Sequence, residues 1–169
     1  MKKISLSLAI LGLAVSSNIF SQQTKTVSDK RDLFTVDIPE SWVAASEAKS
    51  IITLMYIIDP DYLDEKLSIS TTSVPQNLAG SYKINKGALK DFKKFVVLEE
   101  GEGKLNDQDC MWFVCTWATK EGDQMKGKQY TLKYEGKNYC IQYHVKESRF
   151  DAVKEPYEKI ISSLKLAKK

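Results

Sequence analysis

His144 is the only histidine of the 169-residue chain, so it is the first residue to consider for acid–base chemistry. A serine–histidine hydrolase would also need an activated serine within reach of the imidazole. The chain contains no G-x-S-x-G motif, and the sequence around His144 identifies no such serine. We therefore interpret His144 as an ordinary surface or interlayer histidine, and we expect no catalytic residue in this protein.

Three cysteines, Cys110, Cys115 and Cys140, could form a disulfide in an oxidising compartment. Cys110 and Cys115 fall on one predicted strand, about 16 Å apart. If the last three strands form a meander, Cys115 and Cys140 lie two strands apart, about 9.5 Å, which is beyond disulfide reach. The chain also lacks a C-x-x-C motif, and a single histidine argues against a zinc site. We therefore expect three free cysteines, with no metal and no cofactor.

An acidic cluster that follows the apolar run 50–58 could bind calcium weakly: Asp59, Asp61, Asp64 and Glu65. It lacks the glycine and the distant bidentate glutamate of an EF-hand loop. We therefore favour a solvated turn over a metal site, and weak metal binding stays an alternative function.

Four tyrosines alternate along the segment 129–145 and could line a stacking platform for a sugar or a peptide: Tyr130, Tyr134, Tyr139 and Tyr143. The other interpretation is that these rings form a sheet face buried beneath a helix, and that their hydroxyls reach the edge of the buried face. We favour burial, because an aligned aromatic face is usually covered. The glycine-containing connections 99–103 and 120–127 match no phosphate-binding loop and are interpreted as turns.

The segment 129–145 has the alternation of a β-hairpin. With Gly136 and Lys137 as the two central turn residues, the turn is of type II′, which matches the twist of the strands. The opposed pairs are then Leu132 with Ile141, Tyr134 with Tyr139, and Tyr130 with Tyr143. The other face of the hairpin carries mainly polar residues: Gln129, Thr131, Lys133, Cys140, Gln142 and His144.

The elements that would position these residues are mostly strands. Periodicity and turn signals predict strands over 33–38, 50–58, 67–74, 95–105 and 110–119, in addition to the hairpin. Helical spacing predicts helices over 85–95 and 149–163. Within the second helix, Pro156 either kinks the helix or is the first residue of its main segment. The runs 50–58 and 111–118 are apolar on both sides, which indicates helical cover on both faces of the sheet.

The N-terminus predicts a secretory signal peptide over 1–21, because Lys2 and Lys3 precede an apolar run too short to span a bilayer. Cleavage is expected after Ser21, with Ser17 as the alternative. A polar leader over 22–32 and a single domain over 33–169 follow. The mature chain keeps 23 basic and 22 acidic residues, a balance that excludes long-range attraction to nucleic acid. We expect an exported protein, periplasmic or secreted, with no transmembrane segment in the mature chain.

A further motif opens the domain, in the segment LFTVDIPESWV over 33–43. Proline ends the strand because it cannot donate to the ladder, and Trp42 can then fold back over the end of the sheet. The pattern Phe34-x-Val36-x-Ile38-Pro39-x-x-Trp42, together with the ending YEKIISSLK over 157–165, resembles the PsbP-like and DcrB-like family. The resemblance covers about 33–166, nearly all of the expected mature chain.

This resemblance implies an α+β fold, an antiparallel sheet of about six to seven strands with helices on both faces, arranged as an αβα sandwich. It also implies a role in binding or assembly support and no enzyme activity. We therefore expect a non-catalytic exported module of the cell envelope with a protein or envelope partner. A hydrolase with an unrecognised site is the alternative, since a shared fold is weak support for a shared function.

Overall fold

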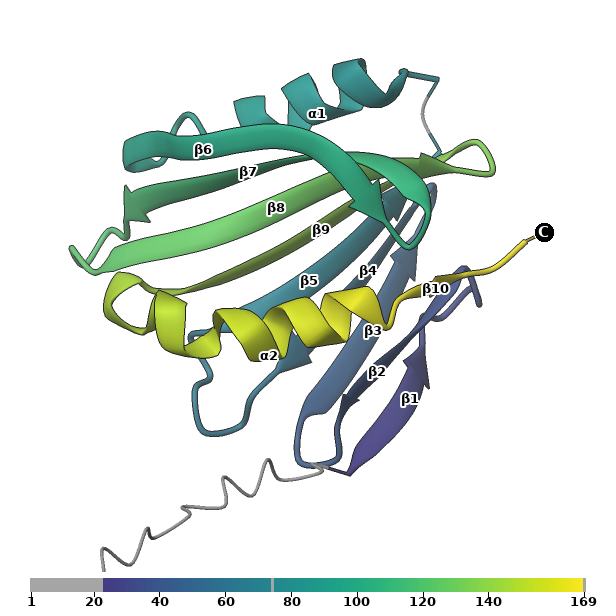
Figure 1. The fold of residues 1–169 in the computed structure, drawn as a ribbon, viewed down its shortest axis with the longest axis horizontal. Helices are drawn as coiled ribbons and strands as arrows, with labels where there is room; N and C mark the ends of the chain where they lie inside the picture. Colours follow the sequence, from purple (N-terminus) through teal and green to yellow (C-terminus); the bar gives the residue numbers. More distant parts are fainter. Residues whose placement is uncertain (1–22, 74, 169) are drawn as a thin grey trace, which may run out of the picture.

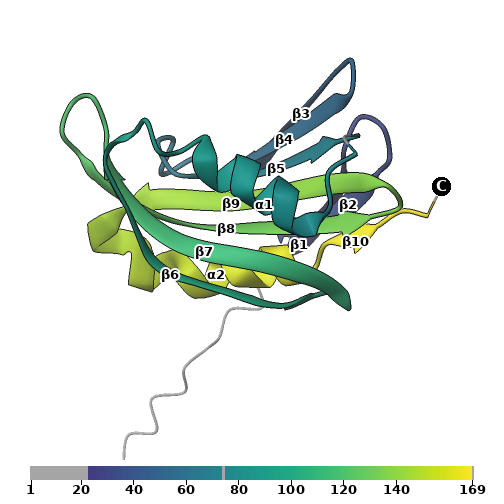
Figure 2. The same cartoon turned by 90° about the horizontal axis from the view of Figure 1, so that it is seen from above.

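The computed structural model describes residues 23–73 and 75–168. The signal peptide expected over 1–21, with both of its candidate cleavage sites, lies outside these residues. Among the described residues, no helix has the length and apolar character needed to cross a membrane. The chain forms a large sheet, a small sheet and two helices (Figure 1, Figure 2).

Seven strands form the large sheet, and every neighbouring pair is antiparallel. Their order across the sheet is β3 (Val43–Lys49), β4 (Ile52–Ile58), β5 (Lys66–Thr72), β9 (Lys137–Lys146), β8 (Gln124–Tyr134), β7 (Gln108–Ala118) and β6 (Lys93–Leu105). Only the pairing of β5 with β9 joins strands that are distant in the sequence. The expected antiparallel sheet of six to seven strands is confirmed.

Three further strands form the small sheet, with β2 (Phe34–Pro39) between β1 (Thr24–Ser28) and β10 (Lys165–Leu166). The helices are α1 (Leu78–Gly87) and α2 (Phe150–Ser162), and a short 3-10 helix, η1 (Glu147–Arg149), leads into α2. The small sheet and α2 lie side by side against the same face of the large sheet (Figure 1).

The hydrophobic core fills the space between the large sheet and the layer made by α2 and β2. Phe34, Val36 and Ile38 alternate inward along β2 and are almost fully buried. The Phe34 ring meets Tyr139 of β9 edge-on, with 6.4 Å between the centroids. Trp42 turns back after Pro39 and lies 5.3 Å from the ring of Tyr157 in α2. The tryptophan beyond the proline therefore folds back into the core, as the sequence predicted.

The helices α1 and α2 contact different side chains of the large sheet. Asn85 of α1 donates a hydrogen bond to the Thr131 hydroxyl, and the Tyr82 ring meets Phe113 edge-on. The neighbouring residue of Thr131, Tyr130, donates instead to Glu158 of α2. Successive side chains of a strand point to opposite faces, so the two helices approach β8 from opposite sides. α1 packs mainly on β8, β7 and β9, and its Tyr82 and Lys86 reach Glu100 of β6, so its side of the sheet is covered in part.

The strand over 50–58 was expected to be covered on both faces, and the structure corrects this. β4 begins at Ile52, which is 45% exposed, and only its odd-numbered side chains are buried in the core. By contrast, β7 is buried on both sides at Phe113 and Val114, where α1 lies over it. The apolar run in β4 therefore reflects one covered face and one open face.

Three strands were not predicted, and the shortest of them is β10, with two residues. β1 lies within the segment 22–32, which was expected to be a loose leader, and it pairs with β2 along its whole length. β3 pairs with β4 in the same way. Both have alternating exposed and half-buried residues and no fully buried one, so they lack the apolar pattern that would have identified them.

The hairpin register is shifted from the predicted one by two residues. Leu132 lies opposite Tyr139, and Tyr134 lies opposite Lys137. The turn residues are Glu135 and Gly136, with φ angles of 47° and 71°. Positive φ at both positions makes a type I′ turn, which matches strand twist as well as the expected type II′ turn does. A shift of two residues keeps every side chain on its predicted face, because the strand period is two.

The first helix was placed too late in the sequence. α1 begins after Asn77, whose side chain accepts a hydrogen bond from the Gly80 amide at 2.8 Å, and it ends at Gly87. Phe92 and Val96 had suggested a helical stripe over 85–95, but they are 45% and 51% exposed, and β6 begins at Lys93.

The C-terminal helix lies where it was expected, and Pro156 is inside it rather than at its start. The proline therefore removes one helical hydrogen bond, which its missing N–H would have donated to the carbonyl of Ala152.

Candidate functional site

A groove of about 870 Å³ lies on the face of the large sheet that α1 covers only in part. Its floor is made by side chains of β4, β5, β9, β8 and β7, and the segment that follows α1 borders it with Leu89 and Phe92. We call this hollow the α1-side groove. It exists because α1 is ten residues long and spans only the half of the sheet near β7 and β8.

Four uncharged polar side chains form a row across the floor of the α1-side groove: Tyr56, Ser68, Gln142 and Gln129. Cross-strand pairing places them side by side, since Tyr56 pairs with Ser68 and Ser68 with Gln142. Gln142 in turn pairs with Gln129 across β9 and β8. We call this set the polar row. Ser68 and Gln129 are buried, whereas Tyr56 and Gln142 are half-buried.

A second row lies beside the polar row and contains His144, with Lys66 on one side and Gly127 on the other. The His144 ring meets the Trp117 indole at 5.7 Å, in an edge-on arrangement. Gly127 makes room for this pair, because a Cβ there would lie 2.7 Å from the Tyr143 carbonyl oxygen and 3.2 Å from the Trp117 ring. The indole is therefore held at the border of the groove by a close approach that only glycine permits.

Burial keeps three titratable side chains on this face of the sheet uncharged: His144, Cys115 and Cys140. Burial, and then the nearby Lys66 ammonium, lower the pKa of His144 to about 4, so its imidazole is neutral at pH 7. Burial raises the pKa of the Cys115 thiol to about 12. It does the same for Cys140, whose pKa is about 12 although a hydrogen bond from Ser70 opposes the shift. Both thiols are protonated at neutral pH and are weak nucleophiles in that form.

The charged residues of the groove are of both signs. Lys66 holds its ammonium 5.0 Å from the centroid of the Tyr56 ring, and Lys146 also borders the groove. Asp64, Glu121 and Asp123 border it as well. The groove therefore has an uncharged centre and a mixed border.

Of the three cysteines considered in the sequence, the structure brings only Cys115 into the lining of the groove. Cys115 of β7 lines the groove, and Cys140 of β9 lies on the same face of the sheet outside its lining. β8 lies between the two strands, which is the order that the meander predicted. Cys110 pairs with Leu132 and faces the core beneath α2. All three cysteines are free.

Two residues of the acidic cluster have partners within the chain. Glu65 is buried, which the interpretation of a solvated turn did not anticipate. Its carboxylate lies 3.4 Å from the Arg149 guanidinium, which in turn stacks over the Tyr62 ring. Asp59 caps its own turn by accepting from the Asp61 amide. Among the described residues, no group of three or more His, Cys, Asp or Glu side chains could hold a metal ion.

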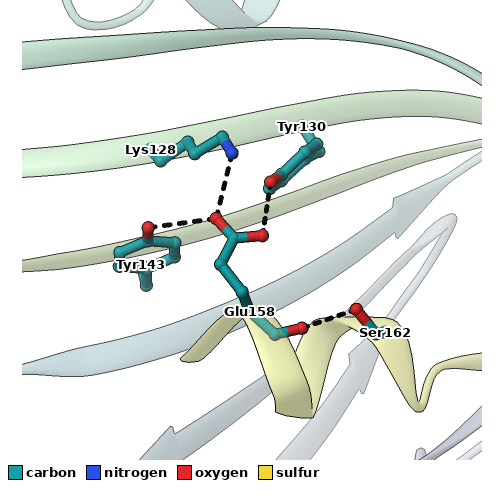
Figure 3. Close-up of polar contacts among 5 residues, drawn as sticks. All are labelled: Lys128, Tyr130, Tyr143, Glu158 and Ser162. Atoms are coloured by element: carbon teal, nitrogen blue, oxygen red, sulfur yellow. Dashed lines mark hydrogen bonds and ion pairs between the residues drawn. The ribbon is translucent and has the colours of Figure 1, made fainter. Parts of the chain in front are cut away.

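The tyrosines of the hairpin form no open platform, because α2 covers Tyr130 and Tyr143 and β2 covers Tyr139. Tyr143 stacks on Tyr157 of α2, with 5.0 Å between the ring centroids and 6° between the planes. Glu158 accepts hydrogen bonds from the hydroxyls of Tyr130 and Tyr143 and from Lys128 Nζ (Figure 3). Tyr139 is buried beside Phe34. The interpretation that this face is buried is confirmed.

The alternation along 129–145 indicated the polar face of the hairpin but not the groove. Gln129, Gln142 and His144 were placed together correctly on one face. Tyr56 and Ser68 could not be added, because nothing local indicates that β5 pairs with β9. One feature of the sequence could have indicated the border of the groove. Trp117 and Gly127 are a very large and a very small residue on neighbouring strands, and the glycine leaves room for the indole.

No family model matches the chain. No curated protein matches it either. Solved structures match it over most of its length. The solution structure of cyanobacterial PsbP (CyanoP) from Synechocystis sp. PCC 6803 is 16% identical, with a TM-score of 0.64, and the match covers 92% of this chain and 99% of that one.

Two further solved structures are similar. LpqN of Mycobacterium tuberculosis, described as involved in cell envelope biogenesis, is 12% identical with a TM-score of 0.61, over 86% of this chain and 91% of that one. A protein of Bacteroides thetaiotaomicron VPI-5482 is 16% identical with a TM-score of 0.58, over 87% of this chain and 50% of that one. At these identities the likeness concerns the fold alone. The chain has the PsbP-like fold that the residues from Phe34 to Trp42 indicated.

Proposed function

We propose that this protein is an exported, non-catalytic binding module of the cell envelope, and that the α1-side groove holds its ligand. The observation that supports this most is the polar row, four hydrogen-bonding side chains aligned across an open groove. Binding sites of this kind are concave, of several hundred Å³, and combine apolar walls with a few placed polar groups. The groove has that size and that composition.

A non-catalytic role is supported by the state of the groups that could start a reaction. A base with a pKa of about 4 has little tendency to remove a proton from a hydroxyl at pH 7. The protonated thiols of Cys115 and Cys140 are poor nucleophiles, and burial holds them in that state. The groove is therefore better suited to holding a molecule than to converting it.

Export is supported by the basic start at Lys2 and Lys3 and by the apolar run that follows. The similar fold of a protein described as involved in cell envelope biogenesis agrees with an envelope location. Mass spectrometry of the native protein tests export directly. A mature chain that begins at Gln22 is expected, and a chain that still begins near Met1 would contradict export.

Binding is tested by capture from the envelope of the native host. The exported protein is purified, immobilised and incubated with an envelope extract, and the retained compounds are identified by mass spectrometry. The variant Gln142→Trp fills the centre of the groove, and Gln108→Trp places the same side chain at the start of β7, remote from the groove. Circular dichroism of each variant verifies that it is folded.

We expect a compound that the wild-type protein and the Gln108→Trp control retain and the Gln142→Trp variant does not. Its mass should be the same before and after incubation with the protein. Conversion of the compound into another would make the protein an enzyme. Equal retention by all three proteins would place the binding site outside the groove.

A further inference from the structure

We infer that the α1-side groove binds a neutral saccharide, which lies along the polar row with one sugar ring against the Trp117 indole. The inference rests on the proposed function, because it names the ligand class of the same groove. Four features support it: the hydrogen-bonding character of the floor, an amide without a partner, the aromatic border and the distribution of charge.

The polar row has the chemistry that sugar hydroxyls require. Hydroxyl and carboxamide side chains can each donate and accept hydrogen bonds, as sugar hydroxyls do, whereas ammonium groups only donate and carboxylates only accept. Tyr56 and Ser68 supply hydroxyls, and the row continues with the carboxamides of Gln142 and Gln129. The row crosses four neighbouring strands, a length of about 14 Å at the usual strand spacing, which suits a short oligosaccharide.

One member of the row has an unfilled hydrogen-bonding group. Gln129 is only 3% exposed, and its amide nitrogen Nε2 has no hydrogen-bond partner within the described part of the chain. Buried donors without acceptors are uncommon in native proteins and unfavourable. A ligand hydroxyl seated beside Gln142, the cross-strand neighbour of Gln129, would supply the acceptor that the chain itself does not.

The border of the groove supplies the apolar contact. The Phe92 and Trp117 rings lie 5.9 Å apart at an angle of 31°, and Phe92 is 45% exposed although it is aromatic. One face of a pyranose ring carries mainly C–H groups, which pack on the negative face of an aromatic ring. Gly127 and His144 fix the position of the indole for such a contact.

The charge distribution favours a neutral ligand. Three lysines, Lys66, Lys128 and Lys146, and three acidic residues, Asp64, Glu121 and Asp123, line the groove, and the Lys128 ammonium is paired with Glu158. Such a mixture attracts neither polyanions nor polycations from a distance. At the centre of the floor, His144 adds no charge at neutral pH.

An extended peptide fits the groove less well than a saccharide. Peptides that add to a sheet pair with the main chain of an exposed edge strand. The floor strands β4, β5, β9, β8 and β7 are each paired on both sides within the large sheet, and the edge strands are β3 and β6. Only side chains are therefore available in the groove, as in the recognition of a sugar.

The inference is tested by NMR on the exported, ¹⁵N-labelled protein with neutral disaccharides as probes: maltose, cellobiose, lactose and N,N′-diacetylchitobiose. The protein has three tryptophans, Trp42, Trp112 and Trp117. Their indole N–H signals are assigned with the variants in which each is replaced by Phe. Trp42 lies in the core, and Trp112 lies on the other face of β7 from Trp117, against Gly101. The uncharged peptide N-acetyl-Gly-Gly-amide is the competing probe.

We expect at least one disaccharide to shift the Trp117 signal in a saturable manner and to leave the Trp42 and Trp112 signals in place. Gln142→Leu should weaken that binding about tenfold or more, because a sugar hydroxyl then loses its partner. The control Gln108→Leu removes the same type of side chain far from the groove and should leave the affinity unchanged. If Gln142→Leu is not folded, Ser68→Ala tests the same row with a smaller change.

Two results would overturn the inference. One is the absence of any shift of Trp117 with the disaccharides. The other is a shift of Trp117 with the acetylated peptide only. The capture experiment with envelope extract shows whether only the saccharide assignment is wrong or the proposed binding function as well. A retained compound that is not a saccharide overturns the sugar assignment and leaves the binding module in place, whereas no retained compound contradicts the binding module itself.

Discussion

The Tyr130 hydroxyl of β8 donates a hydrogen bond to the Glu158 carboxylate of α2 at 2.6 Å, and this contact joins the helix to the large sheet (Figure 3). The same carboxylate accepts from Lys128 Nζ at 3.0 Å and from the Tyr143 hydroxyl at 3.1 Å. Burial, and then the carboxylate itself, raise the pKa of both tyrosines. Their hydroxyls therefore stay protonated and keep donating over the physiological pH range.

Replacing Glu158 by Ala should lower the free energy of unfolding by about 1.5–3 kcal/mol, because three donors lose one charged acceptor. The control is Glu155→Ala, which removes an exposed carboxylate from the same helix and should change stability by less than about 0.5 kcal/mol. Urea denaturation of both variants measures the difference. Equal stability of the two variants would mean that the three hydrogen bonds contribute nothing to the attachment of α2.

Replacing Trp42 by Ala should cost about 3–5 kcal/mol of stability, because it leaves a cavity beside Tyr157 in the core. Trp42→Phe keeps an aromatic ring at the same place and should cost less. The midpoints of urea unfolding give both values. A small effect of Trp42→Ala would show that the turn after Pro39 can be lost without loosening the core.

Replacing Gly127 by Ala should destabilise the protein by about 1–3 kcal/mol, because its Cβ would meet backbone and the Trp117 ring in a closely packed region. The indole N–H signal of Trp117 should shift, since the ring must move. Gly87→Ala is the matched control: apart from its chain neighbours and the backbone of its own helix, no atom lies within 4 Å of a Cβ there. The substitution should be neutral or stabilising by up to about 1 kcal/mol. Equal costs at the two positions would contradict the close approach at Gly127.

The parts of the fold that follow from local periodicity could be predicted from the sequence. The hairpin faces and the C-terminal helix were placed correctly, because alternation and the helical stripe around Tyr157 are local patterns. The hairpin register was predicted wrongly, because a shift of two residues leaves the pattern of buried side chains unchanged. The observed turn at Glu135 and Gly136, in place of the predicted turn at Gly136 and Lys137, requires a positive φ angle at Glu135. Glutamate seldom adopts such an angle, so the sequence favoured the other turn.

The α1-side groove could not be predicted, because it depends on contacts between distant segments. Ser68 and Gln142 meet only through the pairing of β5 with β9. One face of β4 is open because α1 does not extend over it. The position of α1 was predicted wrongly, because the helical spacing of Leu89, Phe92 and Val96 indicated a helix over 85–95, and α1 spans Leu78–Gly87. A segment whose apolar residues are exposed around a groove has the same composition as one that is buried. Only the three-dimensional arrangement distinguishes the two.

The burial of His144 predicts a specific pH dependence of stability. Its folded-state pKa of about 4 lies below the value of about 6.5 for an exposed histidine in the unfolded chain. Between these values the unfolded chain binds a proton that the folded protein does not, so the contribution of His144 to stability is complete above about pH 6.5 and is lost as the pH falls toward 4. Other titrating groups add their own pH dependence, which a His144→Gln variant retains.

Lowering the pH from 7 to 5 should therefore destabilise the wild-type protein by about 1–2 kcal/mol more than it destabilises the His144→Gln variant. Urea denaturation of both proteins at the two pH values measures this difference, and an NMR titration of the His144 ring gives the folded-state pKa independently. Lys66→Met should bring that pKa part of the way back toward 6.5, because it removes the nearby positive charge and leaves the burial in place. If the wild-type protein and His144→Gln lose the same stability between pH 7 and 5, the imidazole is accessible to solvent in the folded protein, and its contact with Trp117 does not exclude water.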